Sequence, residues 1–489
     1  MNLATPLAKH WIGGDWAASE RSGTSVNPST GAVLGSFADG GLAEATAALE
    51  AARAAFDHSA WARDRSLRAR ALRELAEQLA ARAEPLIQMI AREVGKTLPG
   101  AAMEARTAPD TLRHNAGLAL AQRGAASEIA PGVMGMSLHE PLGVAGIIVP
   151  WNAPLALFVR AVGPALAAGC TAVVKMPGQT GLTNGLIAEA IAATASLPPG
   201  VLNLFTESGD EGARLLVDSP LTDVVSFTGS TKVGRQIAAK AADTLKRVSL
   251  ELGGKTPLVI FDDASVDAVA PVVVAALTTF SGQFCMTGSR VLVQSSVADV
   301  WRARLAALLE AVVLGPADDP ASQLGPLIDR ASVERVARIV EDAARTGRVL
   351  VRGGPVTEGP LSAGAFFRPA MVEPDSPTAP LVQQEIFGPV LSFETFDDES
   401  QAIALANATE YGLAASVFTR DVDRAQRVVA GLKAGTVWIN GWAALSDSYE
   451  EGGMKQSGLG RLRGAAALGE FQETKTVIQI VDGVAAAHH

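Results

Sequence analysis

Two short glycine-flanked segments contain residue types that can carry out covalent catalysis together. The segment Leu250–Lys255 includes Glu251, and the segment Gly282–Gly288 includes Cys285, one of only two cysteines in the chain. A thiolate can attack a carbonyl carbon, and a carboxylate can later activate water against the thioester that forms. We therefore interpret Cys285 and Glu251, which are 34 residues apart (285 − 251), as a candidate nucleophile and base.

Both residues have an ordinary alternative. Most glutamates are solvated surface groups, and a free cysteine is often a small buried hydrophobe. We assign that structural role to Cys170, which follows Ala-Ala-Gly and precedes a predicted strand. Cys285 differs because Gly282 and Gly288 open its surroundings.

An amide side chain follows a predicted buried strand. The run from 144 to 149 is apolar throughout, which is typical of a strand in a parallel sheet, and Pro150-Trp151-Asn152-Ala153-Pro154 comes directly after it. Open α/β sheets bind their ligands beyond the carboxyl ends of such strands. Asn152 could donate a hydrogen bond to a developing oxyanion there, or it could simply cap the next helix.

Three further segments have residue types suited to a dinucleotide. Lys175 ends a predicted strand and could reach ribose hydroxyls or phosphate. Gly229 and Ser230 precede a predicted helix, whose N-terminus attracts phosphate. Glu385 could bind two ribose hydroxyls, and Phe387 could face a nicotinamide ring. In isolation these are equally a solvated lysine, a common strand–helix turn and a turn with a buried phenylalanine. The six histidines have no metal-binding spacing, so we predict no metal site.

The elements that must position these residues alternate along the chain. Apolar runs predict strands at 144–149, 171–175, 201–205, 224–227, 257–261, 290–294, 349–352, 391–396, 415–418 and 436–439. Helical spacing predicts helices at 42–56, 64–94, 101–122, 155–168, 182–196, 212–217, 234–246, 298–314, 333–346, 399–408 and 422–430. This alternation indicates two doubly wound α/β units.

The remaining segments are predicted as follows. Residues 9–40 form short strands and turns, residues 366–390 are rich in loops, and residues 446–459 form a glycine-containing loop. Residues 127–143 form an exposed strand or hairpin. The β-type run 476–481 has no local partner, so we expect it to pair with a distant strand or with another subunit.

Length and composition exclude several classes of protein. A chain of 489 residues is too long for one core and should divide into two or three domains. A net charge of −10 argues against an extended nucleic-acid surface. The longest apolar run, 268–280, contains Pro271 and is too short to span a bilayer, so we predict a buried helix. Two cysteines cannot form a disulfide framework, and the N-terminal residues lack the apolar core of a signal peptide. We expect a cytoplasmic protein without nucleic-acid or membrane partners.

Taken together, the motifs resemble those of the aldehyde dehydrogenase superfamily from about residue 9 to about residue 480. The matching segments, in the family's order, are Pro150–Asn152, Lys175, Phe227–Ser230, Glu251–Gly254, Gly282–Cys285, Glu385–Pro389 and Lys455–Gly458. The resemblance implies a Rossmann-like NAD(P)-binding domain (1–122 and 142–253) and an α/β catalytic domain (254–456). It also implies an oligomerisation β-ribbon (123–141 and 470–489) in a homodimer or homotetramer.

The resemblance also implies a reaction. Cys285 attacks an aldehyde, and Asn152 together with the Cys285 backbone N–H binds the oxyanion. Hydride passes to NAD(P)+, and Glu251 then activates water to release the carboxylic acid. The catalytic set is Cys285, Glu251, Asn152 and Lys175. The cofactor-binding set is Val149, Pro150, Trp151, Lys175, Gly178, Gly209, Phe227, Gly229, Ser230, Leu252, Gly253, Glu385 and Phe387. The substrate set is Ala153, Leu157, Arg160, Phe284, Met286, Leu445 and Glu451.

Some positions depart from the family's common pattern. Many NAD-using members have a glutamate where this chain has Gly178, so both NAD and NADP are candidates, with NAD slightly favoured. Glu450 and Glu451 stand where an aromatic residue is usual. Asn152-Ala153-Pro154 with Arg160 resembles members that oxidise benzaldehyde-type substrates such as salicylaldehyde or vanillin.

The sequence leaves alternatives open. Arg160 could instead bind the distal carboxylate of a semialdehyde, or lie on the outer side of its helix in a surface ion pair. A CoA-acylating enzyme is disfavoured by Glu251, because that chemistry protects the thioester from activated water. A non-catalytic structural relative is disfavoured by the presence of Cys285, Glu251 and Asn152.

Overall fold

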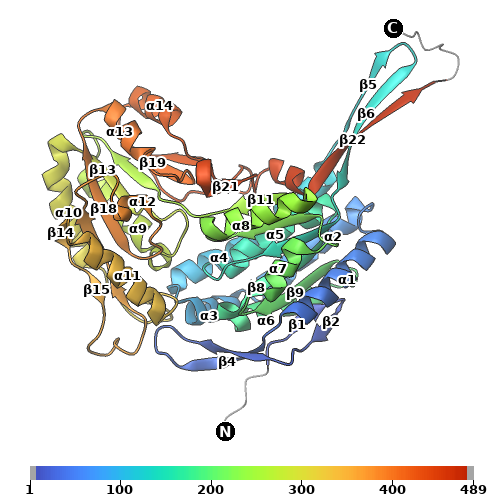
Figure 1. Ribbon diagram of the computed structural model, residues 1–489, viewed down its shortest axis with the longest axis horizontal. Helices are drawn as coiled ribbons and strands as arrows, with labels where there is room; N and C mark the ends of the chain where they lie inside the picture. Colours follow the sequence, from blue (N-terminus) through green and yellow to red (C-terminus); the bar gives the residue numbers. More distant parts are fainter. Residues whose placement is uncertain (1–6, 482–489) are drawn as a thin grey trace.

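The chain forms two α/β sheets and a projecting β-ribbon (Figure 1). This computed structural model describes residues 7–481. The first sheet has eight strands in the order β2-β1-β9-β8-β7-β10-β11-β21. Its strands are β1 (His10–Ile12), β2 (Asp15–Ala17), β7 (Val144–Ile148), β8 (Thr171–Pro177), β9 (Leu202–Glu207), β10 (Val224–Thr228), β11 (Arg247–Glu251) and β21 (Gly458–Leu459).

The first sheet is doubly wound around β7. Strands β7, β8 and β9 are parallel and progress to one side, whereas β10 and β11 are parallel and progress to the other. The strand order therefore reverses between β7 and β10. In open α/β sheets, ligands bind in the crevice beyond the carboxyl ends of the strands at this point.

Helices cover both faces of the first sheet. Successive strand residues point to opposite sides, and here both sides are apolar, so each face packs against helices. One face, which includes Ala145 and Ile147, packs against α2 (Arg65–Ala81), α3 (Ala83–Val94), α4 (Leu98–Ala121), α5 (Pro154–Ala168) and α6 (Gly181–Ala192). The other face, which includes Val144 and Ile148, packs against α1 (Leu42–His58), α7 (Glu211–Asp218) and α8 (Thr231–Ala241).

The second sheet has seven strands in the order β14-β17-β18-β13-β12-β19-β20. They are β12 (Pro257–Ile260), β13 (Arg290–Gln294), β14 (Arg348–Val351), β17 (Ala370–Glu373), β18 (Val390–Phe396), β19 (Ala414–Phe418) and β20 (Thr436–Ile439). Its helices are α9 (Val266–Thr278), α10 (Ala298–Glu310), α11 (Arg330–Ala343), α12 (Pro380–Gln383), α13 (Glu399–Ala406) and α14 (Val422–Gly431). Helices α9 and α10 share one buried cluster with this sheet, and α13 and α14 share another. The predicted pair of α/β units is confirmed.

Three strands form the ribbon that leaves the body of the molecule (Figure 1). They are β5 (Ala125–Ala130), β6 (Val133–Pro141) and β22 (Gln472–Ile480). Strand β22 is antiparallel to β6 from Gln472, opposite Pro141, to Ile480, opposite Val133. The expectation that the C-terminal β-run pairs with a distant strand is therefore confirmed. Residues 482–489 of the expected ribbon, and residues 1–6 of the expected cofactor domain, lie outside the described residues.

Small hairpins complete the fold: β3 (Ser22–Val26) pairs with β4 (Val33–Ala38), and β15 (Gly354–Pro355) pairs with β16 (Phe367–Arg368). Across residues 7–481, none of the helices has the length and apolar content needed to cross a bilayer.

Two predictions about elements were wrong, and a third segment has more regular structure than expected. The single helix expected at 64–94 is divided at Arg82, because Pro85 fits the first turn of a new helix but not a helix interior. The helix expected to reach residue 246 ends at Ala241, and residues 247–251 form β11. The loop expected at 366–390 contains β16, β17 and α12, whose short sequences become regular through pairing and packing with their neighbours.

Candidate active site

The carboxyl end of β11 packs against the turn that carries Cys285. Glu251 is the last residue of β11, and Gly254 follows it closely. A Cβ atom on Gly254 would lie 2.3 Å from the carbonyl oxygen of Cys285, so only glycine permits this approach. The two glycine-flanked segments therefore meet in space.

The Cys285 turn has an unusual backbone. Phe280, Ser281 and Gly282 all have positive φ angles, of 52°, 58° and 74°. Side chains disfavour this left-handed region, so the surrounding structure must hold Phe280 and Ser281 in place. Ser281 Oγ donates to the carbonyl oxygen of Gly325 at 2.9 Å, and this contact fixes the turn.

The two cysteines have different surroundings. Cys285 is partly exposed and Cys170 is buried. Burial raises the pKa of the Cys285 thiol; Arg160 opposes this effect, and Glu451, Glu385 and Glu251 reinforce it. Cys170 Sγ lies 3.3 Å from the carbonyl oxygen of Phe471, and burial raises the pKa of this thiol to about 12. Cys170 therefore has the buried position that the sequence predicted.

Asn152 lies beside the nucleophile turn. Its Nδ2 donates to the carbonyl oxygen of Gln283 at 3.0 Å, and the side chain is buried. A primary amide has two N–H groups, so one remains for an oxyanion. The alternative that Asn152 caps the helix is wrong, because Ala153 is the N-cap residue of α5.

Glu251 lies beside a buried arginine. Arg160 Nη1 is 3.8 Å from Glu251 Oε2 and 2.5 Å from Glu451 Oε1. Arg160 Nη2 donates to Thr228 Oγ1 at 2.9 Å. Burial raises the pKa of the Glu251 carboxyl to about 8, although Arg160 opposes the shift. The alternative that Arg160 forms a surface ion pair is wrong, because only 3% of its surface is exposed.

Aromatic side chains gather next to Cys285. The Phe284 ring makes edge-to-face contacts with Phe280 at 5.4 Å and with Trp442 at 6.0 Å. Trp442 Nε1 donates to the carbonyl oxygen of Met286 at 3.0 Å. The Met286 side chain is fully buried in a cluster with Leu413, and Cys285 packs against that cluster.

The other predicted substrate residues lie at different depths. Met286, predicted to contact substrate, is fully buried next to Cys285 in the cluster with Leu413. Ala153 is buried at the start of α5, and Leu157 is partly buried in the next turn. Leu445 is exposed in the loop after β20.

A groove of about 440 Å³ lies where the strand order of the first sheet reverses. Its apolar lining is Ile148, Val217, Phe227, Val233 and Ile237, and its polar lining is Asp210, Arg214, Asp218, Gln236 and Lys240. Ser230 Oγ accepts a hydrogen bond from the Val233 N–H at 3.4 Å and so caps α8 at this groove. Apolar walls suit a flat base, and a helix N-terminus suits a pyrophosphate.

Lys175 lies on β8, among acidic groups. Burial lowers the pKa of Lys175, while the charges of Glu207, Asp39 and Asp210 oppose that effect. None of these carboxylates is among the groups that perturb Cys285. Lys175, predicted for both the catalytic and the cofactor sets, lies near the carboxyl end of β8, opposite Ile148 of β7 and Phe205 of β9.

Gly178 closely approaches the loop after β9. A Cβ atom there would lie 2.3 Å from Ser208 Oγ, so this position does not accommodate a larger residue without rearrangement. Gly209 lies in the same loop and is exposed.

Glu385 and Phe387 face the first sheet from the second. Glu385 Oε1 accepts a hydrogen bond from the Gly254 N–H at 3.2 Å, and burial raises the pKa of this carboxyl to about 7. Phe387 makes an edge-to-face contact with Trp151 at 5.6 Å. A Cβ atom on Gly253 would lie 2.5 Å from Glu385 Oε2, so glycine permits this close approach. Leu252 is buried against α8. Val149 and Pro150 lead from β7 into this region.

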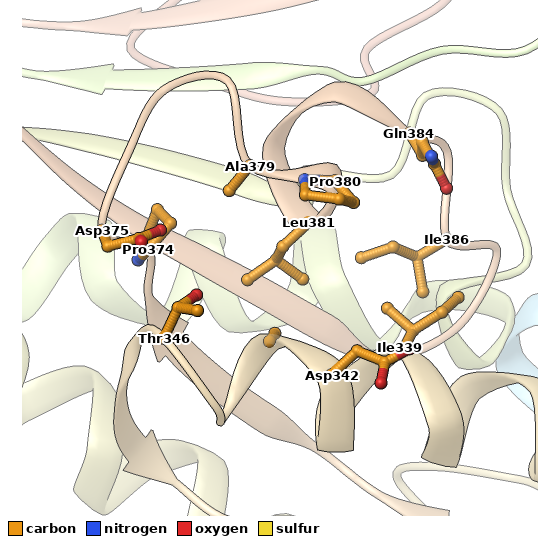
Figure 2. A pocket seen from close by; sticks show the side chains of 11 residues that line it. Ile339, Asp342, Thr346, Pro374, Asp375, Ala379, Pro380, Leu381, Gln384 and Ile386 are labelled. Carbon is orange, nitrogen blue, oxygen red and sulfur yellow. The ribbon is translucent and has the colours of Figure 1, made fainter.

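A separate cavity of about 160 Å³ lies behind the Glu385 loop (Figure 2). Leu381, Ile386 and Ile339 point into it, with Asp342 and Asp375 at its edge. Its lining contains no cysteine, histidine or lysine, so it lacks the groups needed for the predicted chemistry. Among residues 7–481, no cluster of three or more His, Cys, Asp or Glu side chains could hold a metal ion.

Several residues at the site were missed by sequence reasoning. They are Phe280, Trp442, Asp447 and Arg463. Phe280 could have been found from its closeness in sequence to Gly282. The others come from distant segments with no recurring spacing, so only the fold brings them to the site.

The fold and site define an oxidoreductase with a cysteine beside a dinucleotide-binding type of sheet. Residues 16–477 match the model of the Aldehyde dehydrogenase family, and the chain belongs to this family. The resemblance predicted from the sequence is confirmed.

Similar proteins support this assignment over the whole chain. Phenylacetaldehyde dehydrogenase of Pseudomonas fluorescens is 36% identical, with 96% of this chain and 95% of the relative covered. 2-Hydroxymuconic semialdehyde dehydrogenase of Pseudomonas sp. (strain CF600) is also 36% identical, with 96% and 98% covered. The crystal structure of betaine aldehyde dehydrogenase from Staphylococcus aureus in complex with NAD+ has a TM-score of 0.95. It is 32% identical, and the match covers 98% of this chain and 96% of that one.

Proposed function

We propose that this protein oxidises an aldehyde to the carboxylic acid with NAD(P)+, by a hydrolytic route through an enzyme thioester. The close approach of Gly254 to the Cys285 carbonyl is the observation that carries this proposal, since it brings the ends of the two segments together. The groove at α8 fits a dinucleotide, because it combines apolar walls with a capped helix N-terminus.

Each residue has a defined task in this proposal. The Cys285 sulfur attacks the aldehyde carbon, and the second Asn152 N–H and the Cys285 N–H bind the oxygen. A bound nicotinamide would supply the acceptor for the hydride that this carbon loses, and Cys285 would then carry a thioester. Glu251 then removes a proton from water, the hydroxide adds to the thioester, and the sulfur leaves as the acid forms.

We propose an aromatic aldehyde as the substrate. The edges of Phe280, Phe284 and Trp442 provide an apolar wall next to the nucleophile, and aromatic rings favour such edge-to-face packing. A similar protein named for phenylacetaldehyde is consistent with this class. Arg160 is already paired with Glu451, so it is poorly suited to bind the distal carboxylate of a substrate.

A semialdehyde is the second candidate. It is favoured by the similarity to a 2-hydroxymuconic semialdehyde dehydrogenase and by the presence of a buried arginine at the site. For this candidate, Arg160 would have to exchange Glu451 for the substrate. A comparison of benzaldehyde with a semialdehyde of similar length distinguishes the two, because only the semialdehyde offers a second carboxylate.

We propose NAD rather than NADP as the preferred cofactor. The charges of Asp39, Glu207 and Asp210 act on Lys175, and Arg214 pairs with Asp210, so an added 2′-phosphate would meet three carboxylates against two cations. Asp39 Oδ1 accepts the Ser208 N–H at 2.7 Å, which holds this carboxylate next to Gly178. Asp39 can thus exclude the phosphate although Gly178 has no side chain.

We also propose a cytoplasmic homo-oligomer with separate cofactor (1–122 and 142–253) and catalytic (254–456) domains. Cys170 and Cys285 are both free thiols, which suits a reducing compartment. The ribbon (123–141 and 470–489) would contact another subunit, in a dimer or a tetramer.

The test combines a panel of aldehydes with both cofactors and two variants. We expect Cys285→Ala to abolish oxidation while cofactor binding remains. Glu251→Gln should give a burst of NAD(P)H followed by stalled turnover, because the thioester forms but is not hydrolysed. Turnover by Cys285→Ala would contradict the nucleophile assignment. Acyl-CoA as the product would identify an acylating enzyme, and no NAD(P)H with any aldehyde would identify a non-catalytic relative.

A further inference from the structure

A chain of alternating charges leads from Glu251 towards the protein surface. Arg160 Nη1 lies between Glu251 Oε2, at 3.8 Å, and Glu451 Oε1, at 2.5 Å. Arg463 Nε donates to the other oxygen of Glu451 at 2.7 Å, and Arg463 Nη1 donates to Asp447 at 2.5 Å. Arg160, Glu251 and Glu451 are buried, whereas Arg463 and Asp447 are partly exposed.

The backbone fixes the outer part of this chain. Glu451 and Leu462 exchange two backbone hydrogen bonds, of 2.7 and 2.8 Å, which place Arg463 beside Glu451. Thr111 Oγ1, on α4, donates to Asp447 at 3.1 Å. Arg463 therefore binds one carboxylate oxygen of Glu451, and Arg160 binds the other.

Arg160 is hydrogen-bonded to Glu451 but not to Glu251. Its 3.8 Å separation from Glu251 is an ion-pair distance beyond hydrogen-bond range. Glu251 Oε1 has no hydrogen-bond partner within the part of the chain that the structure describes. The positive charge of Arg160 thus acts on the Glu251 carboxylate through Oε2, while Oε1 remains free to accept a proton from water.

We propose that Arg160 is a positioning residue for Glu251, and that Glu451 controls its action by keeping the guanidinium from pairing with Glu251. This proposal rests on the proposed function, in which Glu251 activates water against the thioester. It gives Arg160 a role in the hydrolytic step for every substrate, rather than recognition of one substrate's carboxylate.

The charged groups around Glu251 shift its pKa in opposite directions, and Arg160 and Glu451 act against each other. They are Arg160 on α5, Glu451 and Arg461 in the segment after β20, Glu470 in the turn 466–471, and Cys285. Burial raises the pKa of Glu251 most, Arg160 and Arg461 lower it, and Glu451 and Glu470 raise it. Loss of the arginine should therefore raise this pKa, and loss of the Glu451 charge should lower it.

The experiment isolates hydrolysis from oxidation. In the absence of cofactor, p-nitrophenyl acetate acylates Cys285, and p-nitrophenolate leaves. Excess ester is then removed, and decay of the acetyl-enzyme is followed by intact mass spectrometry across pH. Because the sulfur is acylated, its own ionisation does not affect this step. The rate should rise with the ionised fraction of Glu251.

We expect the midpoint of this pH profile to move in opposite directions in the Arg160 and Glu451 variants. Arg160→Met should shift it upwards by about one pH unit or more, because an opposite charge at this distance lowers a carboxyl pKa by about 1 to 3 units. Glu451→Gln should shift it downwards and also slow the reaction at its plateau, because the freed arginine pairs with Glu251. Arg160→Lys should return the midpoint towards that of the unmodified protein.

A matched control is Arg302→Met, which removes an arginine that pairs with Asp299 and Glu373 away from the site. It should leave the midpoint unchanged. The double variant Arg160→Met/Glu451→Gln avoids leaving one buried charge alone, and its midpoint should lie between those of the single variants.

Two outcomes would overturn the proposal: midpoints equal to that of the unmodified protein in both single variants, or shifts of both in the same direction. Failure of the proposed function would be distinguishable, because Glu251→Gln would then hydrolyse the acetyl-enzyme at the normal rate.

Discussion

At the scale of single residues, the site depends on groups that keep part of their bonding capacity free. Asn152 uses one N–H for the carbonyl oxygen of Gln283, and this bond orients the other. Glu251 is buried beside a cation that is hydrogen-bonded elsewhere, to Glu451 and Thr228. Such groups are costly to bury, and their retention here is consistent with a role in the reaction rather than in folding.

The amide of Asn152 gives a prediction at this scale. Asn152→Ala removes a preorganised donor to the oxyanion, so kcat should fall by about 100- to 1,000-fold. Steady-state kinetics with an aldehyde that the protein oxidises measures this change. Asn184→Ala is the control for loss of a buried amide, since Asn184 bonds to Pro177 and Thr206 away from Cys285. An unchanged kcat in Asn152→Ala would remove this residue from the oxyanion site.

At the scale of elements, one buried ion pair joins the α3–α4 connection, α4 and α5 to the nucleophile turn. Lys96, between α3 and α4, pairs with Glu104 of α4, and both are fully buried. Glu104 Oε1 accepts the N–H groups of Leu155 and Ala156 at the start of α5, at 2.9 and 3.0 Å. The Lys96 ammonium also lies 3.7 Å from the centre of the Phe280 ring. This pair thereby supports both the helix that follows Asn152 and the left-handed turn before Cys285.

The second prediction follows from the burial of that pair. Lys96→Met should lower the free energy of unfolding by about 3 to 5 kcal/mol, because it leaves Glu104 as an unpaired buried charge. Urea unfolding followed by circular dichroism measures the loss. Lys96→Met/Glu104→Gln should recover part of it, since no net charge is then buried alone.

The control for this change is Arg113→Met, which breaks an exposed pair with Asp110 on the same helix. It should cost less than about 1 kcal/mol. Equal losses in the buried and exposed variants would show that the Lys96 pair does not hold these elements together.

At the scale of the whole molecule, the site lies where connecting segments of the two sheets meet. Glu251 comes from the first sheet and Cys285 from a turn before β13 of the second. Glu385 and Phe387, from the second sheet's side, contact Gly254 and Trp151. Any change in how the sheets pack would therefore alter the site directly.

The ribbon gives the prediction at this scale. Ile478 and Ile480 of β22 are 52% and 58% exposed, and Ile129 of β5 is 59% exposed, which is unfavourable for a ribbon that remains in water. Ile478→Lys/Ile480→Lys should therefore reduce the molecular mass of the assembly measured by sedimentation velocity. Gln479→Lys adds charge to the opposite side of the same strand and should preserve the assembly. An unchanged mass in the double variant would exclude the ribbon as a subunit contact.

The sequence alone determined the alternating α/β units, the glycine-flanked Cys285 and Glu251, and the resemblance to the family, because these are local patterns. Helix and strand periodicity and glycine at close approaches can all be read without knowing the fold. Local sequence also contained the signal for the break at Arg82, since Pro85 alone accounts for it.

Only the tertiary structure decided the surroundings of Glu251. Arg160, Glu451, Arg463 and Asp447 lie on segments that are far apart in sequence, and no spacing relates them. The sequence left Arg160 as a substrate receptor or a surface residue, whereas the fold buries it and commits it to Glu451. Burial and charge pairing depend on every element that surrounds a side chain, and they are therefore properties of the packed molecule.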